Sequence, residues 1–181
     1  MSGKKSLIAI IDMQNAFVNK FTSGLDKKIL EFINNLDPNK ICIAQTRYIN
    51  NENTACYLFE GWKECMEGDI SAEIIDSLKN ISAQKFTKNK YSCWNNEFKS
   101  FIADNNIDKI YFCGVNTGCC VLHSVLDCYN DVMECAVIKD LCASTSGKKY
   151  HDAGLLIIES NITKYRVISS LDAISEINNQ N

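Results

Sequence analysis

The stretch "KIYFCGVNTGCCVLHSVLDCYN", residues 109–130, holds the unit from which this chain is built. Residues 109–115 form a continuous apolar run, which is typical of a strand covered on both faces. Apolar residues then recur at helical spacing in Val121–Leu122, Val125–Leu126 and Tyr129. The pattern predicts a strand, a sharp turn, and a helix that begins near Thr117–Gly118.

The same unit repeats along the 181 residues. Further strand-like runs lie at 6–12, 40–47, 83–88, 134–140 and 164–170, and segments with helical spacing at 25–33, 70–78, 98–102 and 155–158. Alternating strands and helices predict an α/β fold of three layers. We expect a single domain over residues 1–181, with a six-stranded parallel sheet in the Rossmann-like order 3-2-1-4-5-6 and helices on both faces. Residues 48–69 lack a period and are predicted to form a long loop of the kind that covers a site.

Composition excludes several classes of function. Hydrophobic residues make up 46% of the chain, the net charge is −3, and no basic stripe indicates a nucleic-acid partner. The apolar run "LIAII" is too short for a signal peptide or a membrane span, so we expect a cytoplasmic protein with no membrane partner. The ten cysteines include no C-x-x-C pair, and there are only two histidines. We therefore expect mostly buried free thiols, no metal and no cofactor.

In a parallel sheet, ligands bind beyond the carboxyl ends of the strands. The residues at those ends are Asp12, Arg47, Lys88, the 115–120 turn, Asp140 and Ser170. A thiol in the first turn of a helix is stabilised as a thiolate by the helix dipole. Helical phase favours Cys120 over Cys119 as the reactive thiol, but a shift of one residue in the helix start would reverse that choice.

Other cysteine chemistries fit the local sequence less well. Phosphatase and rhodanese loops need an arginine where Val125 and Leu126 stand, and the T-x-x-C of peroxiredoxins lacks its preceding proline. A Cys–His dyad with His123 stays open, although a lone helical histidine is more often a packed or surface residue.

Three separated motifs resemble the isochorismatase-like cysteine hydrolases, which include nicotinamidases and N-carbamoylsarcosine amidohydrolases. "IAIIDMQNAFV" resembles the family's D-x-Q-x-x-F opening, "FTKNKYSCW" its lysine segment, and "CGVNTGCCVLHS" its cysteine segment. Later, "IKDLCAS" is similar to the family's D-x-x-x-S turn, and His151 stands where a family helix begins. The resemblance implies Asp12, Lys88 and Cys120 as the catalytic residues, the N–H groups of Asn116 and Cys120 as the oxyanion hole, and a cis Val115–Asn116 peptide bond.

The implied activity is hydrolysis of a small amide, carbamoyl or similar C–N substrate through a thioester on Cys120. The expected partners are a small-molecule substrate and further copies of the chain in a homo-oligomer. Metal-binding nicotinamidases carry histidines on the loop after the second strand; here that loop has none, which predicts a poor nicotinamidase. Ser124, Trp94 and Asn116 are milder departures from the family pattern.

The candidate substrate-binding residues are aromatic side chains and one arginine: Phe17, Arg47, Tyr48, Trp62, Tyr91 and Trp94. The aromatic residues could equally belong to the core or a dimer surface, and Arg47 could bind a substrate carboxylate or form a structural ion pair. The alternative function is a non-catalytic binding or scaffold protein that keeps the same fold.

Overall fold

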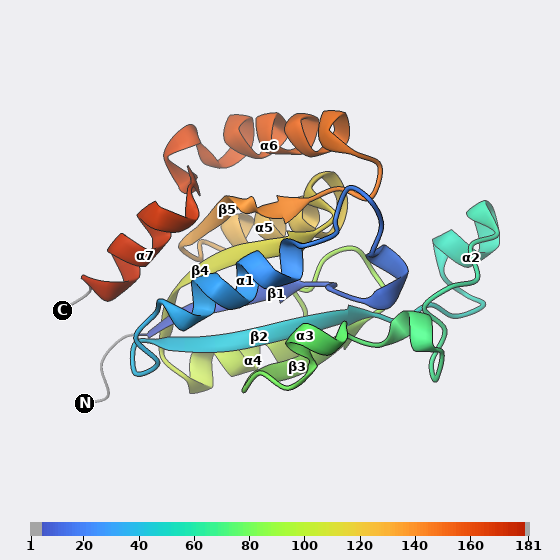
Figure 1. The fold of residues 1–181 in the computed structure, drawn as a ribbon, viewed down its shortest axis with the longest axis horizontal. Helices are drawn as coiled ribbons and strands as arrows, with labels where there is room; N and C mark the ends of the chain where they lie inside the picture. The colour runs from blue at the N-terminus through green and yellow to red at the C-terminus, as the bar shows by residue number, and fades with distance from the viewer. Residues whose placement is uncertain (1–4, 180–181) are drawn as a thin grey trace.

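The computed structural model describes residues 5–179 and contains one six-stranded sheet. Its strand order is β3-β2-β1-β4-β5-β6, and every neighbouring pair is parallel (Figure 1), as the sequence predicts. The strands are β1 (Lys5–Ile11), β2 (Ile41–Tyr48), β3 (Gln84–Lys88), β4 (Ile107–Val115), β5 (Cys135–Ala143) and β6 (Val167–Ile168).

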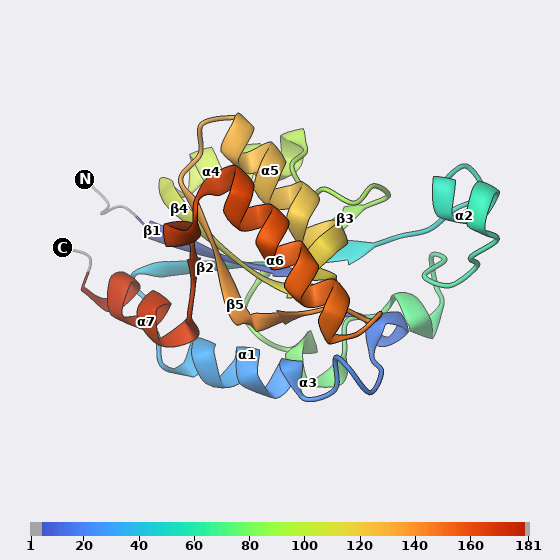
Figure 2. The same ribbon diagram turned by 90° about the horizontal axis from the view of Figure 1, so that it is seen from above.

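Helices cover both faces of the sheet, which completes the three predicted layers. Figure 2 shows α4, α5 and α6 on one side of the sheet and α1, α3 and α7 on the other. Their bounds are α1 (Leu25–Asn34), α2 (Ala55–Glu60), α3 (Asp76–Lys79), α4 (Asn96–Asp104), α5 (Leu122–Asn130), α6 (Lys148–Ile162) and α7 (Ser170–Asn178). The shorter turns are η1 (Asn15–Phe17), η2 (Ile70–Ala72), η3 (Thr117–Val121) and η4 (Lys164–Arg166).

The core lies along the two central strands. Residues 7–11 of β1 and 110–113 of β4 are buried, because helices pack against both faces of these strands. This double coverage is why their sequences read as continuous apolar runs instead of alternating ones.

Among the predicted elements that differ in extent from the observed ones are the last strand and the helix over 70–78. The strand expected at 164–170 pairs only over Val167–Ile168, because Ser169 caps α7 in a reciprocal hydrogen-bonding box with Asp172. The helix expected over 70–78 is broken into η2 and α3. Backbone hydrogen bonds from Asn15 to Glu73 (3.0 Å) and from Ile75 to Met13 (3.0 Å) hold the intervening residues against the chain that follows β1.

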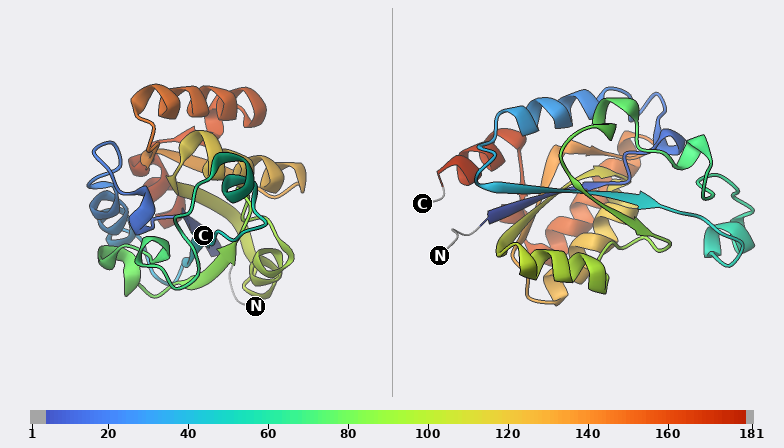
Figure 3. Two further views of the ribbon diagram at one scale, coloured as in Figure 1. Left: turned by 90° about the vertical axis from the view of Figure 1, so that its right-hand side faces the viewer. Right: turned by 90° about the horizontal axis from the view of Figure 1, so that it is seen from below.

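The long loop after β2 projects beyond the carboxyl ends of the strands. It contains the short helix α2, which has no apolar period in the sequence and stands apart from the three layers (Figures 1 and 2). The left panel of Figure 3 looks toward this end of the molecule, with α2 in front of the sheet. The fold thus brings this loop to the same end as Asp12, Lys88 and the 115–120 turn.

Candidate active site

A buried ion pair stands at the carboxyl ends of β1 and β3. Asp12 follows β1, and Lys88 is the last residue of β3, where it pairs in register with Tyr48 of β2. Lys88 Nζ lies 2.6 Å from Asp12 Oδ2, and both side chains are almost fully buried. A close opposite charge is what allows two ionised groups to stay buried.

Thr46 of β2 fixes the Asp12 carboxylate. Its hydroxyl donates to Asp12 Oδ1 at 2.6 Å and accepts from the Asp12 backbone N–H at 3.1 Å. Asp12 has a φ of 49°, a left-handed conformation that aspartate tolerates better than most residues. This kink turns the carboxylate from the strand direction toward β2 and β3.

Gln14 ties the chain after β1 to the ends of other segments. Its side-chain amide donates to the carbonyl oxygens of Tyr48 (3.0 Å) and Ala72 (2.8 Å), and its Oε1 accepts from the Tyr48 N–H at 2.8 Å. The glutamine of the D-x-Q motif is therefore a fully buried connector of three segments.

The Lys88 ammonium is held charged by its surroundings. Burial is the largest single influence and lowers the pKa of Lys88. The Asp12 charge, the hydrogen bond with Asp12 and the nearby Cys120 and Cys93 together raise it by more, so the pKa of Lys88 lies above its usual range. Lys88 also donates to the Lys90 carbonyl oxygen at 3.1 Å, and its Nζ lies 5.4 Å from the centre of the Tyr48 ring. These contacts leave Lys88 a fixed cation.

Cys120 lies in η3, the π-helical turn between β4 and α5. Gly114 lets β4 approach β1 here, because a Cβ at Gly114 would stand 2.2 Å from the Ile11 carbonyl oxygen. The Val115–Asn116 peptide bond is cis, as the resemblance implies. The Asn116 side chain accepts a hydrogen bond from the Thr145 N–H at 2.7 Å, which joins η3 to the loop after β5.

The two adjacent thiols differ in environment. Cys120 is buried, and its pKa is raised well above the usual value by a hydrogen bond with Cys119, by burial and by the Asp12 charge, with Lys88 opposing. Cys119 is half-buried, and the same hydrogen bond is the largest cause of its lowered pKa. Cys120 therefore rests as a thiol that needs a base, which corrects the thiolate expected from its place at the start of a helix. The Asp12 carboxylate is close enough to influence its ionisation.

Helix α6 supports η3 through a close contact between backbones. A Cβ at Gly154 would stand 2.7 Å from the Gly118 nitrogen, so only glycine fits there. Thr117 Oγ1 lies 3.0 Å from the Ala143 carbonyl oxygen and 2.8 Å from His151 Nδ1. Because the single hydroxyl hydrogen of Thr117 goes to the carbonyl, His151 donates from Nδ1. Burial lowers the pKa of His151. These contacts anchor the turn that carries Cys120.

A cavity of about 300 Å³ opens in front of the two cysteines. Four of the six predicted substrate-binding residues line it, namely Phe17, Tyr48, Trp62 and Tyr91. Cys119, Cys120 and Asn116 line it as well, together with Thr145 from the loop after β5. Asp12 and Lys88 are not lining residues; they are buried and act on the pKa of Cys120.

The structure places the other two predicted substrate-binding residues elsewhere. Arg47 forms ion pairs with Glu73 (3.1 Å) and Glu67 (3.6 Å), which is the structural alternative that its sequence position left open. The Trp94 indole N–H donates to Asp131 at 2.6 Å, and Asp131 follows the end of α5 opposite to Cys120. Neither lines the cavity.

Two other candidate residues, Asp140 and His123, do not line the cavity. Asp140 is inside β5, not at its end, and its carboxylate accepts from the N–H and hydroxyl of Ser170 at 2.8 and 2.5 Å. His123 is exposed; its Nδ1 lies 2.8 Å from the Cys119 carbonyl oxygen, and its ring contacts Tyr91. His123 is absent from the described lining of the cavity, so the structure does not favour it as the base.

Sequence reasoning missed some residues that shape the site. Cys56 and Glu60 of α2 line the cavity, but they come from a loop without a period, where no sequence signal marks them. Asn50 holds this loop, since its side-chain amide donates to the carbonyl oxygens of Trp62 (2.8 Å) and Glu64 (3.1 Å). Ser124 departs from the family pattern, and its hydroxyl donates to the Cys120 carbonyl oxygen (2.7 Å) and accepts from the Cys93 N–H (3.0 Å).

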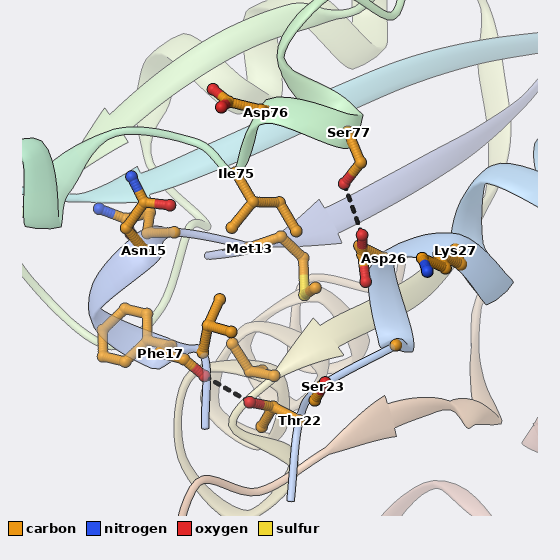
Figure 4. Close-up of a pocket in the computed structure, with 14 residues that line it drawn as sticks. Met13, Asn15, Phe17, Thr22, Ser23, Asp26, Lys27, Ile75, Asp76 and Ser77 are labelled. Atoms are coloured by element: carbon orange, nitrogen blue, oxygen red, sulfur yellow. Dashed lines mark hydrogen bonds between the residues drawn. The ribbon is translucent and has the colours of Figure 1, made fainter. Parts of the chain in front are cut away.

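A separate cavity of about 470 Å³ lies between the start of α1 and α3. Figure 4 shows Met13 and Ile75 at this cavity, with the Ser77 hydroxyl donating to Asp26 at 2.6 Å. Phe17 lines both cavities, and the Thr22 hydroxyl donates to its carbonyl oxygen at 2.7 Å. None of Asp12, Lys88 and Cys120 lines this second cavity, so we place the candidate chemistry at the first.

The loop after β2 does not fit a metal ion. Within residues 5–179 there is no group of three or more histidine, cysteine or acidic side chains placed to hold one. The nearby Glu67 is paired with Arg47. No helix in the described part of the chain has the length and apolar character needed to cross a membrane.

Comparisons with known proteins agree with the fold and show the family. The family model of the isochorismatase domain matches residues 6–166. An isochorismatase-like hydrolase from Alkaliphilus metalliredigens is 20% identical with a TM-score of 0.81, covering 95% of this chain and 98% of that one. An N-carbamoylsarcosine amidase from Thermoplasma acidophilum is 17% identical with a TM-score of 0.78, covering 92% and 96%. A nicotinamidase from Bacillus subtilis is 18% identical with a TM-score of 0.76, covering 91% and 99%.

A search among curated proteins finds no match. The identities to solved structures are low enough that these neighbours show the fold alone, whereas the family model spans most of the sequence. The chain belongs to the isochorismatase family of hydrolases.

Proposed function

We propose that this protein is a cysteine hydrolase that cleaves a small amide, carbamoyl or similar C–N substrate through a thioester intermediate. The observation that carries the proposal is the position of the Cys120 thiol, which lines a cavity and lies beside the buried Asp12–Lys88 pair. A buried ion pair contributes little net stability compared with apolar residues of the same size. Its presence beside a thiol therefore supports catalysis over a scaffold role.

The proposed first half-reaction forms the thioester. Asp12 accepts the proton of the Cys120 thiol, and the sulfur attacks the substrate carbonyl carbon. The N–H groups of Asn116 and Cys120 bind the oxyanion, and the Lys88 cation stabilises the developing negative charge. The tetrahedral intermediate then breaks its C–N bond, and the leaving amine takes the proton from Asp12.

The second half-reaction releases the product. Water attacks the thioester carbonyl carbon, with Asp12 accepting its proton, and the C–S bond breaks to give the acid or carbamate. The proton on Asp12 returns to the Cys120 sulfur, which restores the resting thiol. The atoms and protons of both half-reactions balance with only the substrate, water and the residues of this chain.

The test is detection of the acyl-enzyme. The protein is mixed with a panel of small amides, carbamoyl compounds and ureides, quenched in acid and measured by intact mass, with ammonia release followed in parallel. We expect an adduct on Cys120 for at least one compound. In Asp12→Asn, which keeps the size of the side chain, we expect turnover to fall by about 10²–10⁴-fold because the amide cannot accept the thiol proton. Full activity of that variant at neutral pH would contradict the assigned base.

A further inference from the structure

Glu60 gives the candidate substrate cavity a negative charge. It is the last residue of α2, its side chain is exposed, and it lines the cavity. The described lining contains no lysine, arginine or histidine. The nearest buried cation, Lys88, is paired with Asp12, and Arg47 is paired with Glu67 and Glu73 outside the cavity.

No basic side chain of the described residues forms a salt bridge with Glu60. The charge of Glu60 influences Tyr91, another lining residue. The pKa of Tyr91 is raised by a hydrogen bond with Cys56, by burial and by nearby negative groups that include Glu60. The carboxylate is therefore available to a ligand in the cavity.

Four of the other lining residues are aromatic, namely Phe17, Tyr48, Trp62 and Tyr91. The Phe17 and Trp62 rings stack with their centres 6.0 Å apart and an angle of 23° between the planes. The centre of the Tyr48 ring lies 6.0 Å from that of the Trp62 ring. Ring faces attract cations, and no lysine or arginine of the described chain stands over Phe17, Trp62 or Tyr91.

We propose that the substrate carries a positively charged alkylammonium or quaternary ammonium group, held between Glu60 and the rings of Trp62 and Tyr91. This inference rests on the proposed hydrolase function, because the amide end of the same molecule must reach Cys120. A substrate with a carboxylate at that end meets a like charge and no counter-ion, so the cavity selects against it.

The first test compares three primary amides of equal chain length. Their far ends are trimethylammonium, the neutral and equally shaped tert-butyl group, and carboxylate. We expect kcat/KM to be about tenfold higher for the cationic amide than for the tert-butyl amide, and lowest for the carboxylate. Glu60→Gln should bring the cationic-to-neutral ratio close to one. Glu64→Gln is the matched control, because Glu64 lies on the same loop but does not line the cavity, and it should leave the ratio unchanged.

The second test measures binding without turnover. Trp62 and Trp94 are the only tryptophans, so Trp94→Phe leaves Trp62 as the fluorescent reporter. We expect tetramethylammonium chloride to change the Trp62 emission saturably, with weaker binding in the Glu60→Gln variant, and potassium chloride at equal ionic strength to have no such effect.

The outcomes separate the two proposals. If tetramethylammonium binds but no amide is hydrolysed and no acyl adduct forms, the hydrolase function is overturned and the cation site stands. If amides are hydrolysed but show no preference for the cation, or are hydrolysed while tetramethylammonium does not bind, the substrate class inferred here is wrong and the hydrolase stands.

Discussion

At the scale of single residues, adjacent positions in the sequence have different surroundings. Cys119 is half-buried and Cys120 is buried near Asp12 and Lys88. The charges at the site come from separate strands, and each is held by neutral partners such as Thr46 and the Lys90 carbonyl. The chemistry we propose depends on these neighbours more than on the identity of any one side chain.

The two cysteines should respond differently to removal. Cys120→Ala should lower amide hydrolysis by more than about 10³-fold, as expected for loss of a nucleophile, while Cys119→Ala should keep most of the rate. Equal loss from both changes in folded protein would contradict the assignment.

The hydrogen bond with Cys119 is the largest cause of the raised pKa of Cys120. Cys119→Ala should therefore lower that pKa, which the pH dependence of Cys120 alkylation measures by mass spectrometry.

Lys88→Met should destabilise the fold. Removing one partner of a buried pair leaves the other charge uncompensated, at a cost of about 3–5 kcal/mol near neutral pH. The pKa of Lys88 is raised in the folded state, so its stabilising contribution is complete below the unfolded value of about 10.4 and is lost as pH rises through the higher folded value. Urea unfolding of the unaltered protein and of the Lys88→Met variant should give free energies of unfolding whose difference becomes smaller in strong alkali. A constant difference would contradict this account.

At the scale of elements, the strand–turn–helix unit at 107–130 is held in place by α6 and by the segment between β3 and α4. Gly154 permits the backbone contact between α6 and η3, and Ser124 bonds to the Cys93 backbone. The position of Cys120 is thus a product of three packed elements.

Gly154→Ala tests the contact between α6 and η3. Helix propensity alone predicts that alanine stabilises a helix interior by about 1 kcal/mol. Because the new Cβ would meet backbone atoms of Gly118 and Thr117 within 3.0 Å, we expect destabilisation by about 1–3 kcal/mol instead. Gly118→Ala is the matched control: its Cβ would meet ordinary contacts at 3.5 Å or more, and thermal unfolding should change little.

At the scale of the whole molecule, the loop after β2 projects beyond the carboxyl ends of the strands (Figure 1) and carries no histidine. Exposed apolar side chains, such as Phe59 on this loop and Leu156 on α6, leave surface for a second copy, and the homo-oligomer stays a prediction.

Metal removal should leave the activity unchanged. The described residues hold no group of three metal-ligating side chains, and the loop carries no histidine. We expect chelator treatment to have no effect on amide hydrolysis, elemental analysis to find no stoichiometric metal, and nicotinamide to be a poor substrate. Rapid ammonia release from nicotinamide, or loss of activity with a chelator that added metal restores, would show that this loop has been misinterpreted.

The sequence alone determined that the sheet is parallel and covered on both faces, because this follows from local apolar runs alternating with helical segments. The strand order was expected from a Rossmann-like fold, and the three residues proposed for catalysis come from motifs at strand ends that resemble those of the family. Only the tertiary structure decided which side chains line the cavity. Arg47 and Trp94 lie outside the cavity lining, and each contacts an acidic residue distant in sequence. Arg47 pairs with Glu73, and Trp94 donates to Asp131. Glu60 is brought in by a loop whose course Asn50 sets through hydrogen bonds to Trp62 and Glu64. Such long-range pairings leave no periodic trace in the sequence, since each depends on where other segments come to lie.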